Sequence, residues 1–234
     1  MIEAPTPRRA PGLLDGAAIV VTAVELALAG YIWRFGPAGR IPMHFGLHGE
    51  VNGWGDRAEA AALIGGLALA MGGLYAVLPA MALGRAHDET SRRTLSLARA
   101  SLLIVPAVIT GLFVYLSFGQ GAHADPVMRI RVIMAVIALL LLGTGLVVGK
   151  VGPNPFVGVR TPWSRRSRLA WDRSNRLLGR MMFWTGLAGL LAAPLAPQPQ
   201  AMTVFVLASV LAALLPVYES WRVWKQDPER TGGT

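Results

Sequence analysis

Long apolar segments alternate with short polar ones along the whole chain. Six of these segments are nearly free of charge and lie near 14–34, 60–83, 101–119, 131–150, 179–197 and 201–220. A helix needs about 20 residues to cross a hydrocarbon core roughly 30 Å thick, and each run approaches that length. The runs lack the strict alternation of membrane β-strands. The pattern therefore predicts an all-α fold, a polytopic transmembrane bundle of about six helices.

The composition supports a membrane protein. Hydrophobic residues make up 53% of the 234 residues and charged residues 15%, whereas soluble domains usually carry about 25% charged residues. The net charge is +9. In a soluble protein this excess would suggest nucleic acid, but in a polytopic protein it fits cytoplasmic loops that meet anionic lipid. We therefore expect contacts with membrane lipids and none with nucleic acid. The absence of cysteine excludes a thiol nucleophile and disulfides.

The basic residues predict the orientation. With the N-terminus inside, the cytoplasmic segments hold most of them, among them Arg8, Arg9 and Arg85. Only five of the 22 Lys and Arg residues then lie outside, namely Arg34, Arg40, Arg57, Arg129 and Arg131. Because basic residues concentrate in cytoplasmic loops, both termini are predicted to be cytoplasmic. The expected location is the bacterial cytoplasmic membrane.

The first apolar run has a second interpretation, because a cleavable signal peptide also begins with basic residues. The run is long for such a peptide and is interrupted by Asp15 and Glu25, so we expect a retained helix. We divide the chain into an N-terminal half, 1–99, with two helices and a structured outer loop at 36–58. The C-terminal half, 100–234, holds four helices and a basic cytoplasmic loop at 151–178.

The outer loop contains Pro42 and four glycines between residues 41 and 56, which forbid a long helix and predict a structured loop. We expect His44 and Trp54 to fold it against the outer helix ends. Histidines and carboxylates can bind zinc, so the candidate metal ligands are His44, His48, Asp56 and His123. A hydrogen-bonded loop is the favoured interpretation, because neither Cys nor HExxH accompanies them. We expect no cofactor.

The inner loop has a distinct pattern. Asn154 lies between two prolines, which indicates a turn, and Gly158 can adopt angles that other residues avoid. Arg160 can bind a carboxylate, a phosphate or a row of carbonyls with two parallel hydrogen bonds. After Pro162 the chain can restart as a helix capped by Ser164 or Ser167. Its arginines alternate with leucines and Trp171, which fits a helix lying on an anionic membrane surface, or simply a basic loop that sets topology.

Glu25 is the one carboxylate near the middle of a predicted span. An ionisable residue inside the membrane is by default a candidate functional residue. The other interpretation is structural: an ion pair with Arg129 or Arg131, or simple protonation of the carboxyl group. Signatures of soluble enzymes, such as a phosphate-binding loop, GxSxG or HExxH, are absent from the sequence. We therefore expect no enzymatic activity.

The inner loop carries a resemblance to a known family. The segment Asn154-Pro-Phe-Val-Gly-Val-Arg-Thr-Pro-Trp163, followed by Trp171, Asn175 and Gly179, resembles the signature of the bacterial SdpI family, with Val159 in place of the usual Ile. The matching positions taken as candidate site residues are Asn154, Gly158, Arg160, Thr161, Pro162, Trp163, Trp171 and Asn175. The outer loop is similar to the domain of unknown function usually found before it, through Pro42, His44, Gly49, Asn52 and Trp54.

The resemblance implies an immunity or signal-transduction role. The type member of the family protects its producer against a secreted peptide toxin and recruits a transcriptional repressor to the membrane. One departure is the basic Ser164-Arg-Arg-Ser-Arg168 where relatives often carry acidic residues. A small transporter or lipid-handling protein using Glu25 is one alternative, and a metal-dependent membrane enzyme is another. Replacement of Arg160 by lysine is predicted to impair function. The same replacement at Arg165, Arg166 or Arg168 is predicted to be tolerated.

Overall fold

The computed structural model describes residues 12–82, 89–154 and 157–230. Among these residues, six helices are long and apolar enough to cross a membrane, which confirms the predicted all-α polytopic bundle. They are α1 (Leu13–Phe35), α2 (Arg57–Ala82), α3 (Glu89–Ser117), α5 (Pro126–Val148), α7 (Arg168–Leu195) and α8 (Gln200–Gln226). Short elements join them: β1 (Ile41–Phe45), β2 (Val51–Gly55), α4 (Gln120–His123) and α6 (Pro162–Arg165).

The helices extend beyond the apolar runs, most of all at α7. The sequence predicted its span from residue 179, preceded by either a helix on the membrane surface or a basic loop that sets topology. Instead α7 is continuous from Arg168, so the separate surface helix is wrong. Its basic residues form the first turns of the spanning helix, because Lys and Arg side chains at a helix end can reach the headgroup region. Ser167 is the N-cap, as predicted, whereas Ser164 lies inside α6.

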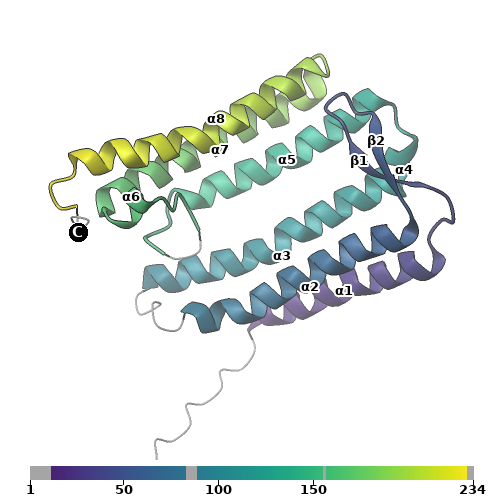
Figure 1. Ribbon diagram of the computed structural model, residues 1–234, viewed down its shortest axis with the longest axis horizontal. Helices are drawn as coiled ribbons and strands as arrows, with labels where there is room; N and C mark the ends of the chain where they lie inside the picture. Colours follow the sequence, from purple (N-terminus) through teal and green to yellow (C-terminus); the bar gives the residue numbers. More distant parts are fainter. Residues whose placement is uncertain (1–11, 83–88, 155–156, 231–234) are drawn as a thin grey trace, which may run out of the picture.

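The spanning helices form two groups of three, seen in Figure 1 as α1, α2 and α3 on one side and α5, α7 and α8 on the other. Each group has its own buried cluster. The first centres on Ile32, Ile41 and Ile64, and the second on Met134 and Phe205. In space α3 therefore lies with α1 and α2. The sequence division at residue 99 stays a prediction.

Glycines allow α5 and α7 to pack with their backbones in close contact. A β-carbon at Gly145 would lie 2.5 Å from the backbone nitrogen of Phe183 and 2.8 Å from the carbonyl oxygen of Gly179. On α7, one at Gly186 would lie 2.5 Å from the nitrogen of Leu142. Small residues let helices approach closely in lipid. The Gly145-Leu-Val-Val-Gly149 motif thus serves packing within the chain.

The outer loop is a two-stranded antiparallel hairpin that touches both helix groups. Strands β1 and β2 pair with an irregular register, and Ile41 is 2% exposed in the first cluster. The hydroxyl of Ser117, at the end of α3, donates to the carbonyl of Pro42 (2.7 Å). Arg129, on α5, donates to the carbonyl of Gly49 (3.0 Å). The loop is therefore structured, as predicted, but as a hairpin that the sequence did not indicate.

The two ends of the bundle differ in what they carry. Figure 1 places the hairpin and α4 at one end of the bundle, and α6 with the C-terminal end of α8 at the other. Along the spans, large apolar side chains such as Leu69, Leu139 and Leu211 are more than half exposed, as contact with lipid tails requires. Which end faces the cytoplasm stays a prediction. Arg8, Arg9 and Arg85, which contribute to it, lie outside the described residues.

Candidate functional site

The inner loop between α5 and α7 begins with a turn closed by Asn154. Its side-chain amide donates to the carbonyls of Gly152 (2.9 Å) and Val157 (3.0 Å). Its side-chain oxygen accepts from the backbone nitrogen of Val157 (2.7 Å). An asparagine that mimics backbone in this way fixes a turn. One side chain thus joins Gly152 and Val157, which agrees with the turn predicted at Asn154.

Gly158 and Asn175 connect the loop to α7. Gly158 has φ +116°, which favours glycine. The next residue, Val159, donates its backbone N–H to the side-chain oxygen of Asn175 (2.8 Å), and the amide of Asn175 donates to the carbonyl of Trp171 (3.0 Å). Asn175 is 1% exposed. Both polar ends of a buried side chain are thus satisfied by backbone, so the loop has one defined position on the helix.

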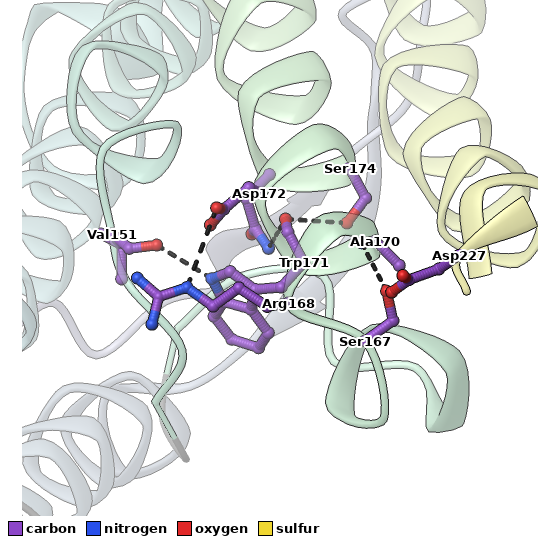
Figure 2. A network of polar contacts seen from close by, with 9 residues as sticks. Val151, Ser167, Arg168, Ala170, Trp171, Asp172, Ser174 and Asp227 are labelled. Atoms are coloured by element: carbon purple, nitrogen blue, oxygen red, sulfur yellow. Dashed lines mark hydrogen bonds and ion pairs between the residues drawn. The ribbon is translucent and has the colours of Figure 1, made fainter. Parts of the chain in front are cut away.

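Trp171 lies under the loop. It is 1% exposed, and its indole nitrogen donates to the carbonyl of Val151 (3.0 Å), a contact drawn in Figure 2. The same residue's carbonyl accepts from the hydroxyl of Ser174 (3.2 Å). The buried indole thus joins the start of the loop to the first turn of α7. This role is structural, and it explains why a tryptophan with a polar ring nitrogen suits the position.

Serine and threonine hydroxyls connect the loop to α8. Thr161 caps α6 by accepting from the backbone nitrogen of Ser164 (3.0 Å). Its hydroxyl also shares a hydrogen bond with that of Ser220 (2.8 Å). One helix further along, the Ser167 hydroxyl donates to a carboxylate oxygen of Asp227, as Figure 2 shows.

Sequence reasoning missed Ser220 and Asp227, because their partners lie about sixty residues away and no local pattern marks them. Their burial is the sign of a role: Ser220 is 0% exposed and Asp227 6%. A buried carboxylate is costly unless it is hydrogen-bonded. The end of α8 is therefore part of the same polar assembly as the inner loop.

Arg160 differs from its neighbours in the motif. It is exposed, and within the part of the chain that the structure describes its guanidinium makes no hydrogen bond or ion pair. The row of loop carbonyls considered as its partner therefore does not bind it. Pro162 is also exposed, and Trp163 is half-buried on α6. The loop backbone is thus held in place by hydrogen bonds, whereas the guanidinium of Arg160 is accessible to a ligand.

The hairpin places its sequence-predicted residues differently. The side chains of His44 and Asn52 are hydrogen-bonded across the two strands. Yet His44 is exposed and Trp54 is 52% exposed, so the expectation that these two pack against the helix ends is wrong. Ile41 and Gly49 make the contacts with the helices instead. A β-carbon at Gly49 would lie 2.1 Å from the carbonyl oxygen of Pro126, and its φ is +80°, so only glycine fits this contact.

The candidate metal ligands do not gather. Among residues 12–82, 89–154 and 157–230, no group of three or more His, Cys, Asp or Glu side chains is placed to hold a metal ion. His44 has Asn52 as its partner. Asp56 precedes α2 and accepts from the backbone nitrogens of Ala58 (2.8 Å) and Glu59 (2.9 Å). Asp56 therefore caps a helix, which satisfies donors that would otherwise have no partner.

Glu25 is buried inside the first helix group. It is 5% exposed, and the hydroxyl of Thr110 on α3 donates to its carboxyl group (3.1 Å). The proposed pairing with Arg129 or Arg131 is wrong. Arg129 instead binds backbone carbonyls at the hairpin end, those of Gly49 and Gly121. The position of Glu25 remains that of an ionisable group inside a membrane span.

The fold and the site together define a class: a multi-pass helical membrane protein whose inner loop is fixed onto two of its helices. Residues 150–219, which hold this loop with α7 and most of α8, match the model of the SdpI/YfhL protein family. Through this segment the chain is similar to the SdpI/YfhL family. Comparisons with curated proteins and with solved structures found no match to either.

Proposed function

We propose that this chain is an immunity or signal-transduction protein of the bacterial cytoplasmic membrane, one that senses or resists a peptide toxin or another envelope molecule. The family match and the six spans support a membrane protein of this type. The role proposed is binding, not catalysis. In this proposal the ligand binds at the hairpin end, and the inner loop passes the signal to a partner.

The observation that carries the proposal is the exposed guanidinium of Arg160 on a loop held in place by hydrogen bonds of Asn154, Asn175 and Thr161. Ordering a loop costs conformational entropy, and a binding group already held in place avoids that cost when the partner arrives. A guanidinium recognises a carboxylate or phosphate with two parallel hydrogen bonds. The partner at this end is thus an anionic surface, and a transcriptional repressor with exposed carboxylates is the candidate.

At the hairpin end, a recess of about 440 Å³ offers a place for the outer molecule. Its lining includes the exposed ring of Trp54, the cation Arg40 and the carboxylates Asp56 and Glu59. An aromatic face beside charges of both signs suits a peptide, which presents apolar side chains along with its own charges. A recess of this size accepts one or two side chains of the peptide.

The test deletes the gene in the organism that encodes it and challenges the cells with membrane-active peptides. Complementation uses the wild-type chain, Arg160→Lys and Arg165→Lys at matched membrane expression. We expect deletion to sensitise the cells, and both wild type and Arg165→Lys to restore survival. Arg160→Lys should restore it poorly, because lysine keeps the charge but loses the paired geometry.

Arg165 is the matched control because it is exposed and lies in the same basic segment. Equal restoration by the two variants would remove the special role of Arg160. If deletion left the cells as resistant as before to every peptide tried, the immunity proposal itself would fail.

A second candidate function is transport or lipid handling, and one observation favours it: Glu25 is buried in a span beside Thr110. A carboxyl group in this setting can bind and release a proton or a cation. Glu25→Gln keeps the size and a hydrogen-bonding group. Loss of flux in proteoliposomes with this variant, at unchanged thermal stability, would favour transport over sensing.

A further inference from the structure

A groove lies between α5 and α7 at the end of the bundle that carries the inner loop. Its volume is about 880 Å³, and α8 contributes Glu219 at its edge. Four cations line it: Lys150, Arg173, Arg176 and Arg180. Its larger apolar residues are Leu146, Leu177, Phe183 and Trp184. This combination of basic and apolar lining sets the chemistry of any occupant.

The positive charge of the groove is not neutralised within the protein. All four cations are exposed, and with the described residues none of them forms an ion pair within 4 Å or donates a side-chain hydrogen bond. The single carboxylate, Glu219, is already engaged by two hydrogen bonds of 2.7 Å from Arg222, and the charge of Arg173 also acts on it. The groove therefore has an excess of cations over available carboxylates.

The lining changes from basic to apolar along α7. Arg173 lies near the start of the helix and Trp184 lies about 17 Å further along it, at 1.5 Å per residue. The start of the helix is the end of a span, whereas Phe183 and Trp184 lie deeper in it. The cations therefore lie nearer that end of the span, from which long side chains can reach the headgroups, and Phe183 and Trp184 lie further from it.

We propose that this groove binds an anionic phospholipid, with its phosphate among Arg173, Arg176 and Arg180 and an acyl chain along the apolar part. Guanidinium groups recognise phosphate through paired, charge-assisted hydrogen bonds. Basic pockets between spanning helices bind lipid headgroups by the same chemistry. A soluble phosphate would use the cations and leave the apolar part unexplained. The site does not depend on the proposed function, since neither Arg160 nor the hairpin contributes to it.

The experiment uses the full chain, purified in detergent and titrated with phosphatidylglycerol or phosphatidylcholine while bound lipid is counted by native mass spectrometry. Arg176→Gln/Arg180→Gln removes two groove cations. Arg165→Gln/Arg168→Gln is the matched control, because it removes two cations at the same end but outside the groove. Near an anionic surface each cation contributes about fivefold in affinity, so the groove variant should bind phosphatidylglycerol about 25-fold more weakly. The control should change little.

Three results would overturn the proposal: equal weakening in both double variants, equal binding of phosphatidylcholine, or displacement of the lipid by millimolar inorganic phosphate. A second measurement covers the case in which the groove variant does not fold. The wild-type chain is treated with a photoreactive phosphatidylglycerol. Cross-links concentrated in peptides covering 145–150 and 173–184 support the site, and cross-links spread evenly over the six spans contradict it.

Discussion

The side-chain oxygen of Asn175 lies where a β-carbon of residue 158 would project. The distance between that oxygen and an ideal β-carbon built on Gly158 is 2.2 Å, far inside van der Waals contact. The same oxygen accepts the backbone N–H of Val159 (2.8 Å). The glycine and the asparagine of the family motif are thus two parts of one contact between loop and helix.

The first prediction is that Gly158→Ala destabilises this contact. Alanine must adopt φ +116° and must also displace Asn175, so we expect a loss of about 1–3 kcal/mol, the usual cost of a residue held in a rarely populated conformation. Thermal unfolding in detergent measures it. Gly39→Ala is the control, because a β-carbon there meets nothing within 4 Å. An unchanged melting temperature for Gly158→Ala would contradict the described contact.

The second prediction concerns Trp171. Trp171→Phe keeps most of the buried ring but removes the indole N–H that donates to Val151 (3.0 Å). A buried carbonyl left without its donor costs about 1–3 kcal/mol, so the melting temperature should fall. Trp33→Phe serves as the control, because Trp33 is 63% exposed. Equal small shifts for both variants would mean that the Trp171 hydrogen bond contributes nothing measurable.

The third prediction tests the close packing of α5 on α7. Gly145→Ala places a methyl group 2.5 Å from the backbone nitrogen of Phe183, which the backbone cannot avoid without separating the helices. Overpacking of this kind usually costs about 1–3 kcal/mol. Gly143→Ala, two residues earlier on the same helix, meets nothing within 4 Å and should be neutral. A larger loss of stability for Gly143→Ala than for Gly145→Ala would contradict the described packing of α5 on α7.

The fourth prediction is that both termini are cytoplasmic. Because the chain has no cysteine, single cysteines report orientation cleanly. Leu47→Cys lies in the hairpin turn, where the side chain is 48% exposed, and should react with an impermeant maleimide on intact cells. Arg165→Cys, also exposed, should react only after the membrane is opened. Reaction of Arg165→Cys on intact cells would show that the orientation is the opposite of the predicted one.

The number and type of spanning helices could be predicted because apolar runs of the required length are a strong signal. Their ends could not. The run before residue 179 is broken by arginines, which hydropathy counts as polar although long side chains at a helix end can reach water. For this reason α7 was predicted about ten residues too short. The hairpin was missed because its irregular pairing, which matches His44 with Gly53, leaves little alternation to detect.

The site was predictable only in part. Asn154 and Gly158 act locally, and their turn and backbone roles follow from residue type. The contacts made by Asn175 with Val159, and by Thr161 with Ser220, join segments far apart in sequence. Such contacts depend on how the helices pack, which no single segment encodes. The pairing of Glu25 was wrong for the same reason, since its partner Thr110 lies on a helix that packs against α1.

The continuity of α7 has a structural consequence. The helix has 28 residues, about 42 Å at 1.5 Å per residue, and so it exceeds the thickness of the hydrocarbon core. Trp171 and Asn175 grip the loop near one extremity, and Ala193 packs against α5 and α8 near the other. One continuous helix therefore links the inner loop at one surface of the bilayer to the packing of α5 and α8 near the other surface.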